Sequence, residues 1–197
     1  SDVYKRQILA QAARLAHVPV ILCDPGNIER QHLPTVLGVT GLLVPSYRAK
    51  QHWKQMGVSL PIHVVWPGAA VDSRYSESAV KKKETISIVW TGRLHGNKSP
   101  GMFVNAAAAL AKLLGDRVKF FVLGEGFLRP SLETLAYEHF SFSPEQFVFL
   151  GKLTNDNVVK FLHHNATMLI HTTLLNETFS LAVVEGLLAG LPVVTFG

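Results

Sequence analysis

The clearest fold signal in this chain is its final stretch, ETFSLAVVEGLLAGLPVVTFG, which runs from Glu177 to Gly197. The apolar residues from Phe179 to Ala189 predict a helix, Gly190 ends it, and Val193–Thr195 then predicts a short buried strand. Glu185 lies inside this otherwise apolar helix. A carboxylate is costly to bury against a parallel sheet unless a polar group meets it, so we expect Glu185 to contact a polar ligand.

Upstream of this stretch, strands and helices alternate regularly from Thr85 onward. Four more strands are predicted at residues 86–90, 118–123, 147–150 and 168–171, and three more helices at residues 100–114, 128–140 and 155–163. Strands separated by helices of about ten to fifteen residues are typical of βαβ units, which build a parallel, doubly wound sheet of the α/β class. Such sheets bind ligands at the carboxyl ends of the strands, where the strand order reverses.

The first third of the chain predicts a smaller set of similar elements. Helices are expected at residues 7–17 and from an N-cap at Ser46 to about residue 56, and strands at residues 18–22, 41–45 and 62–66. We therefore expect one domain over residues 1–72, a polar linker over residues 73–84 and a second domain over residues 85–197. The chain does not begin with Met and ends after a strand without a closing helix, so we expect a fragment truncated at both ends.

Composition narrows the class of protein. The 197 residues, 48% of them hydrophobic, can bury a sizeable core, and the formal charge of +5 suits anionic partners such as phosphates. Cys23 is the only cysteine, which excludes an intramolecular disulfide and fits a reducing compartment. No apolar run reaches the ~18 residues that span a bilayer. The tryptophans do not alternate with basic residues, so nucleic acid is not an expected partner.

Three glycine-bearing loops follow predicted strands and carry candidate ligand contacts. The first, TGRLHGNKSP, places Gly92, Arg93 and Lys98 at a helix start, where free amides and two cations would hold a diphosphate. The second, VLGEG, contains Gly124 but lacks the third glycine of the dinucleotide fingerprint. The third, FLGKL, contains Leu153, near which backbone groups would meet a nucleobase. Each loop alone is also compatible with an ordinary connection between a strand and a helix.

Two carboxylates frame the last loop. Glu177 precedes a helix start at Thr178, Phe179 and Ser180, where free amides point outward. Glu185 lies two helical turns further along, on nearly the same face. The alternative interpretation is a capping carboxylate and a paired helical Glu. We favour ligand contact, because the glycine loops open at the same edge of the predicted sheet.

Together, the loop motifs resemble the donor-binding domain of GT-B retaining glycosyltransferases of family 4, among the glycosyl transferases group 1. The matching segments are, in family order, GRLHGNKSPG, VLGEG, FLGKL and ETFSLAVVEGLLAGLPVV. Upstream, VPSYRAKQHW and IHVVWPGAAVD resemble the final segments of the family's first domain, so the match covers nearly the whole chain from about Val18. The resemblance implies a nucleotide-sugar donor bound between two Rossmann-like domains, transfer with retention of anomeric configuration, and no metal or other cofactor.

The resemblance also implies roles for individual residues. Arg93 and Lys98 would neutralise the donor's pyrophosphate as it becomes a leaving group, and Glu177 would contact the transferred sugar. Glu185 would accept hydrogen bonds from ribose hydroxyls, and no enzyme nucleophile is implied. Six further positions would line the donor site: Gly92, Gly124, Leu153, Thr178, Phe179 and Ser180.

Some residues depart from the family pattern. Ser180 stands where glycine is usual, Gly186 where alanine is usual, and the run His171-Thr172-Thr173 begins the segment that replaces a usual Pro-Ser. His163 and His164 have no third ligand at helical or hairpin spacing, so no metal site is expected.

The implied partners are a nucleotide-sugar donor and a glycan, lipid or small-molecule acceptor. The implied location is the cytoplasm, either free or associated with the cytosolic face of a membrane. Because most of the acceptor domain is absent, we expect the isolated fragment to be inactive as a transferase. Two alternatives stay open, a non-catalytic module that binds nucleotide-sugars and an NAD-dependent oxidoreductase.

Overall fold

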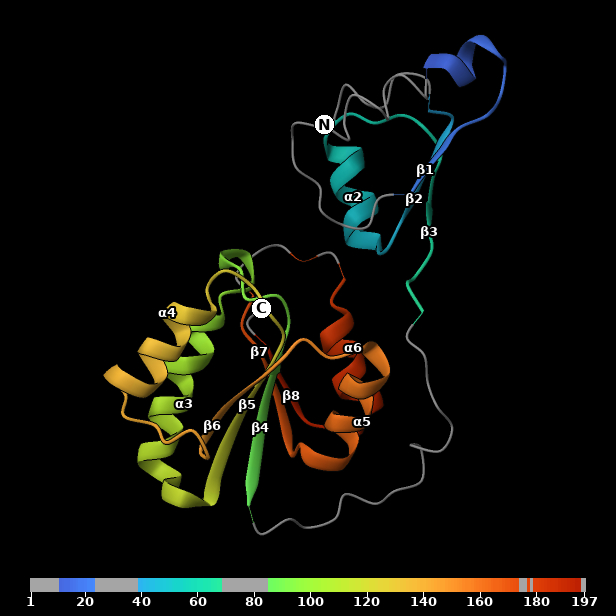
Figure 1. The fold of residues 1–197 in the computed structure, drawn as a ribbon. Coiled ribbons are helices and arrows are strands. Elements are labelled where there is room, and N and C mark those ends of the chain that lie inside the picture. Colours follow the sequence, from blue (N-terminus) through green and yellow to red (C-terminus); the bar gives the residue numbers. More distant parts are fainter. Residues whose placement is uncertain (1–10, 24–38, 69–84, 174–176, 178, 196–197) are drawn as a thin grey trace. The chain divides into compact units, whose positions relative to one another are not determined.

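The structure is a computed structural model that describes residues 11–23, 39–68, 85–173, 177 and 179–195 (Figure 1). The chain divides into two compact units, Ser1–Gly68 with Glu177–Phe179, and Ala69–Asn176 with Ser180–Gly197. Each unit contains one parallel sheet with helices, which confirms the predicted α/β class. The predicted linker, residues 73–84, lies outside the described residues, so the predicted domain limits stay predictions.

In the first unit, three short parallel strands pack with one helix. The strands are β1 (Ile21–Cys23), β2 (Gly41–Val44) and β3 (Ile62–Val64), in the order β1-β2-β3. Helix α2 (Tyr47–Gln55) begins at the predicted N-cap, because the Ser46 hydroxyl accepts a hydrogen bond from the Ala49 amide at 3.1 Å. The small core contains Leu42 and Trp53.

Strand β1 begins three residues later than the sequence predicts. Pro19 lacks the amide hydrogen that a strand ladder needs, so a strand starting at Val18 is disfavoured. Only residues 11–15 of the predicted first helix are described as helical, and residues 7–10 lie outside the described part.

The second unit is built on a five-stranded parallel sheet in the order β6-β5-β4-β7-β8. Its strands are β4 (Ile86–Thr91), β5 (Val118–Leu123), β6 (Phe147–Gly151), β7 (Met168–His171) and β8 (Val193–Thr195). Central strand β4 pairs with β5 on one side and with β7 on the other. The strand order therefore reverses between β4 and β7, which defines the switch point of the sheet.

Helices cover both faces of this sheet. Figure 1 shows α3 (Pro100–Leu114) and α4 (Arg129–Glu133) on one face, and α5 (Asn155–Asn165) and α6 (Leu181–Leu188) on the other. Alternate residues of β4 point to opposite faces, so Ile88 and Trp90 join one core and Val89 the other. Three further short helical segments are η3 (Gly96–Lys98), η4 (Gly115–Arg117) and the π-helix η5 (Thr134–His139).

The predicted helix over residues 128–140 consists of an α-helix followed by a π-helix. Helix α4 ends at Glu133 and continues as the wider π-helix η5, in which the Phe140 amide donates to the Leu135 carbonyl. In this segment the Tyr137 hydroxyl donates to the Phe147 carbonyl at 3.0 Å. The predicted helix is therefore confirmed to within one residue at each end, and periodicity did not indicate that its second half is a π-helix.

Candidate functional site

The candidate site lies at the carboxyl ends of β4 and β7. These strands are neighbours in the sheet, although their sequences are separated by β5 and β6. The loop after β4 leads into α3 and the loop after β7 leads into α6, and these two helices lie on opposite faces of the sheet (Figure 1). The two loops that carry the predicted cations and acids therefore start side by side, at the place where such sheets bind ligands.

Hydrogen bonds from buried threonines join these two loops. The Thr172 hydroxyl donates toward the carbonyls of Ser99 at 2.9 Å and Lys98 at 3.2 Å. The Thr173 hydroxyl donates to the Asn97 carbonyl at 3.0 Å. Both threonines are buried. The η3 turn, which carries Lys98, is thus held against the end of β7.

The two predicted cations interact with each other. Lys98 is half-buried, and Arg93 on the same loop is exposed. Burial, and secondly the charge of Arg93, lower the pKa of the Lys98 ammonium below its usual value. Both causes penalise the charged lysine in the ligand-free protein, and an anion bound beside the pair would relieve them. The structure therefore brings Arg93 and Lys98 together as a site of positive charge.

His171 adds a polar group that sequence reasoning noted only as a departure from the family pattern. It ends β7, is buried, and its Nε2 lies 3.2 Å from the Ser180 hydroxyl. Burial, and secondly the charge of Lys98, lower the pKa of His171, so the ring is neutral at pH 7. Ser180 is the N-cap residue of α6 but makes no side-chain capping bond. Its hydroxyl faces His171 instead of the helix amides.

The structure describes the surroundings of Glu185 more fully than those of Glu177. Glu185 lies on α6, and burial alone raises the pKa of its carboxyl above the usual value. Glu177 and Phe179 are half-buried, and Thr178 lies outside the described residues.

The glycines of the first two loops allow close packing of backbone on backbone. Gly124 has φ +146°, and a Cβ there would lie 1.8 Å from the Gly92 carbonyl oxygen. A Cβ at Gly126 would lie 2.4 Å from the Leu94 carbonyl oxygen, and the Leu94 amide donates to the Glu125 carbonyl at 3.0 Å. This packing accounts for both glycines without a bound dinucleotide. A direct donor contact by Gly92 or Gly124 stays a prediction.

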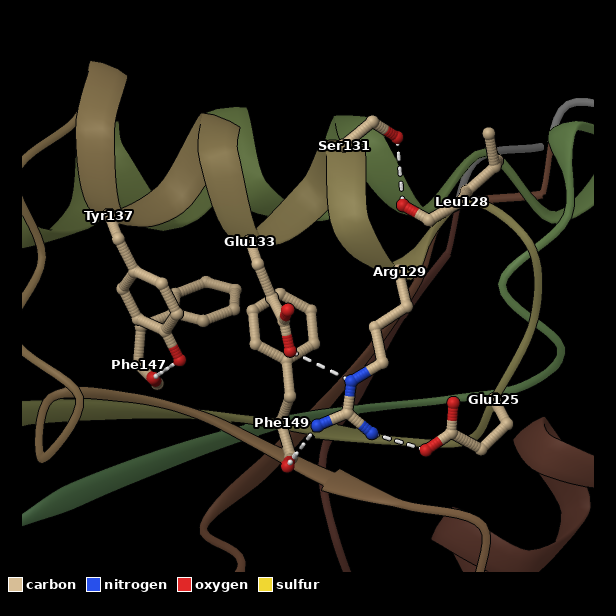
Figure 2. Close-up of polar contacts among 8 residues, drawn as sticks. All are labelled: Glu125, Leu128, Arg129, Ser131, Glu133, Tyr137, Phe147 and Phe149. Carbon is tan, nitrogen blue, oxygen red and sulfur yellow. Dashed lines mark hydrogen bonds and ion pairs between the residues drawn. The ribbon is translucent and has the colours of Figure 1, made fainter.

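An ionic cluster after β5 was missed by the sequence analysis. Figure 2 shows Arg129 between Glu125 and Glu133. Both carboxylates accept hydrogen bonds from its guanidinium, and the bond to Glu133 is 2.8 Å long. Arg129 Nη2 also donates to the Phe149 carbonyl at 3.3 Å, and its Cζ lies 5.9 Å from the Phe149 ring centre. The hydrogen bond to Glu133 is the largest cause that raises the pKa of Arg129.

The missed signal was the spacing of Arg129 and Glu133, four residues apart on the predicted helix, which places their side chains within reach. Glu125 approaches from the preceding loop. The cluster joins the loop after β5 to strand β6. Gly151, with φ +77°, makes room for it, because a Cβ there would lie 2.9 Å from Glu125 Oε1. The half-buried side chain of Leu153 packs against the core that contains Val89, and the predicted nucleobase contact stays a prediction.

Neither a cluster of metal ligands nor a membrane-spanning helix occurs among the described residues. No group of three His, Cys, Asp or Glu side chains there could hold a metal ion, and the rings of His163 and His164 simply pack edge to face at 4.9 Å. No helix in the described part of the chain has the length and apolar character needed to cross a bilayer.

Comparison with known proteins identifies a family and solved structures that share the fold. Residues 85–197 match the family model described as glycosyl transferases group 1. A curated relative is GalNAc-alpha-(1->4)-GalNAc-alpha-(1->3)-diNAcBac-PP-undecaprenol alpha-1,4-N-acetyl-D-galactosaminyltransferase of Campylobacter jejuni. It is 39% identical over 88 residues, which are 45% of this chain and 22% of the relative.

Two solved structures share the fold. One is Anabaena HepE in complex with UDP and glucose, with a TM-score of 0.77, 16% identity, and coverage of 98% of this chain and 57% of HepE. The other is the pneumococcal O-GlcNAc transferase GtfA in complex with UDP and GlcNAc, with a TM-score of 0.78, 15% identity, and coverage of 96% and 39%. The chain thus spans little more than half of HepE and less of the other two relatives.

Proposed function

The chain belongs to the glycosyl transferases group 1 family, and from that premise we propose that it carries the donor half of a retaining GT-B glycosyltransferase of family 4. The reaction moves a hexose-like sugar from a nucleotide-sugar to an acceptor and keeps its anomeric configuration. The acceptor half of the site belongs to the whole protein, so this chain alone binds donor without transferring sugar.

The observation that carries the proposal is the pair Arg93 and Lys98, held at the switch point of the sheet. Burial, and secondly the charge of Arg93, lower the pKa of Lys98, which supports a loop that gathers positive charge. A nucleoside diphosphate supplies the matching negative charge. As the bond between sugar and phosphate breaks, charge grows on the departing diphosphate, and fixed cations stabilise that charge without needing to reorganise.

The acids would grip the hydroxyl groups on either side of the diphosphate. Glu185 has a partly desolvated carboxylate, which gains hydrogen bonds when ribose hydroxyls reach it. Glu177 would contact the transferred sugar, and the amides of Thr178, Phe179 and Ser180 its hydroxyls or the phosphate. Because the acceptor attacks from the face that the phosphate leaves, Glu177 is not assigned as a nucleophile.

We also propose an acceptor class and a cellular location for the whole protein. The C. jejuni relative is named for transfer to a glycan linked through diphosphate to undecaprenol. A lipid-linked glycan is therefore the acceptor class to test first, with the whole protein in the cytoplasm or at the cytosolic face of a membrane.

Calorimetric titration with UDP, GDP and ADP tests the donor site directly. We expect at least one nucleotide to bind this chain, and Arg93→Ala to weaken it by about tenfold or more through loss of a charge-assisted contact. Arg117→Ala is the matched control, because that exposed arginine donates to the Leu114 carbonyl and lies before β5, at the opposite end of the sheet. Binding of no nucleotide, or equal losses in the two variants, contradicts the proposal.

A further inference from the structure

We infer that Thr172 is a positioning residue whose buried hydroxyl fixes the Lys98 turn in the geometry that meets a diphosphate. This inference rests on the proposed function only for the identity of the ligand. The mechanical part, that one hydroxyl joins three segments, stands on the contacts themselves.

The hydroxyl of Thr172 has a complete and directional set of partners. It accepts a hydrogen bond from Trp90 Nε1 at 2.9 Å, and the indole N–H can only donate. Its own hydrogen must then point away from the indole, toward the carbonyls of Ser99 at 2.9 Å and Lys98 at 3.2 Å. Thr172 and Trp90 are almost completely buried, so water does not compete for these bonds. The indole thus sets the direction in which Thr172 donates.

The turn that Thr172 holds has an unfavourable backbone conformation. Ser99 adopts φ +48° and ψ +47°, a left-handed conformation that residues other than glycine rarely take. Ser99 is also the N-cap residue of α3 but makes no side-chain capping bond to that helix. Its carbonyl accepts from both the Thr172 hydroxyl and the Met102 amide. The bond from Thr172 therefore stabilises a peptide whose local preference is for another conformation.

Trp90 also contacts the other end of the loop that carries Arg93 and Lys98. Its ring lies beneath Gly92, where an added Cβ would approach Trp90 Cη2 to 3.1 Å. One side chain of β4 thus contacts the start of the cation-bearing loop through its ring and the end of that loop through Thr172. Arg93 and Lys98 lie between these two contacts in the sequence. The contacts of Trp90 and Thr172 therefore limit how far apart the two cations can move.

Thr172 cannot act by touching the ligand, because its side chain is fully buried. It acts through Lys98, which is half-buried and next to Arg93. Displacements of about 1 Å at a reacting group can lower rates by about a hundredfold. A loose turn would therefore weaken the hold on the diphosphate specifically, and would leave a nucleoside without phosphates bound as before.

The chain provides a matched control at the opposite end of the same two strands. The Thr167 hydroxyl accepts from the Ser87 amide and donates to the Ser87 carbonyl, both at 2.9 Å. Thr167→Val removes a hydroxyl that likewise accepts one backbone or side-chain N–H and donates to a backbone carbonyl next to β4 and β7, but at their amino ends. A general loss of stability would appear in both valine variants, and a positioning effect only in Thr172→Val.

The test compares the binding of UDP and uridine by calorimetry, together with amide hydrogen exchange, in Thr172→Val, Thr172→Ser and Thr167→Val. We expect Thr172→Val to weaken UDP by about tenfold and to leave uridine unchanged. Exchange at the amides of Ser99 and Met102 should become faster in the ligand-free protein. Thr172→Ser keeps the hydroxyl and should restore both values, and Thr167→Val should change neither.

An unchanged ratio of UDP to uridine affinity in folded Thr172→Val overturns the inference, as does an equal change in Thr167→Val. If the wild-type chain binds no nucleotide, the proposed function fails, and the exchange rates of Ser99 and Met102 still decide the role of Thr172. Trp90→Phe is the second variant if Thr172→Val does not fold. It keeps an aromatic ring but removes the N–H that orients Thr172, and it should speed exchange at the same two amides; unchanged rates would overturn the inference.

Discussion

At the scale of single residues, the carboxyl of Glu185 allows a test that separates a proposed ligand contact from a stabilising role. Burial raises the pKa of its carboxyl, so the folded protein binds its proton more tightly than the unfolded chain does. By linkage, Glu185 makes stability fall as the pH rises from the usual glutamate value through the raised folded value. The charged residue therefore costs stability at pH 7, which a ligand with hydroxyl groups would offset.

Glu185→Gln should thus separate stability from binding. At pH 7 we expect the free energy of unfolding to rise by roughly 0.5 kcal/mol after discounting for partial exposure, and UDP affinity to fall. The gain should vanish near pH 4, where the wild-type carboxyl is protonated. Chemical denaturation at both pH values measures it, with exposed Glu138→Gln as the control. A loss of stability at pH 7 would show that Glu185 is a structural residue.

At the scale of loops and elements, two glycines with opposite surroundings test whether backbone packing shapes the site. Gly124→Ala would place a methyl group 1.8 Å from the Gly92 carbonyl oxygen, and we expect a loss of at least about 2 kcal/mol in unfolding free energy. Gly101→Ala, inside α3 with no atom within 4 Å of the added Cβ, should be neutral or stabilising by up to about 1 kcal/mol. Thermal denaturation of both variants measures the difference. Equal effects would contradict the role given to Gly124.

The Arg129 cluster predicts a salt-sensitive stabilisation of the loop after β5. Its carboxylate partners and the Phe149 carbonyl are partly exposed, so we expect Arg129→Met to cost about 1–2 kcal/mol. Part of that loss should disappear in 1 M salt, where exposed ion pairs are screened. Urea denaturation at low and high salt measures both values. Arg117→Met is the control, and a salt-independent loss would assign the effect to packing of the arginine stem.

At the scale of the whole molecule, ligand binding should stabilise the folded chain by mass action. UDP at about one hundred times its dissociation constant should raise the unfolding free energy by about 2.7 kcal/mol. Scanning calorimetry with UDP and with uridine at the same concentration measures this gain and its dependence on the diphosphate. No shift with UDP, GDP or ADP would contradict a donor site in this chain.

The sequence predicted much of this architecture because local signals and tertiary structure agree. The limits of β5 and β7 match the prediction to the residue, and Gly124 marks the end of the β5 run. The Ser46 cap was likewise readable from local chemistry. Arg93 and Lys98 could be nominated because glycine, cations and a helix start occur together within nine residues.

What could not be predicted depends on strand order. Trp90 and Thr172 meet only because β4 lies beside β7, and no local pattern reports that neighbour. The π-helix η5 is another case, since the helix contacts strand β6 through the hydrogen bond from Tyr137 to Phe147. The burial of His171 and its approach to Ser180 also require the folded end of β7.

The bond between Thr172 and Ser99 spans 73 residues and has a consequence for biosynthesis. Ser99 leaves the ribosome long before Thr172, and strand β7, which Thr172 follows directly, docks beside β4 only after two intervening strands have been made. Until then, the peptide at Ser99 has no distant partner to hold its left-handed turn. A nascent chain therefore completes the long-range contact to the Ser99 turn only after strand β7 has been made.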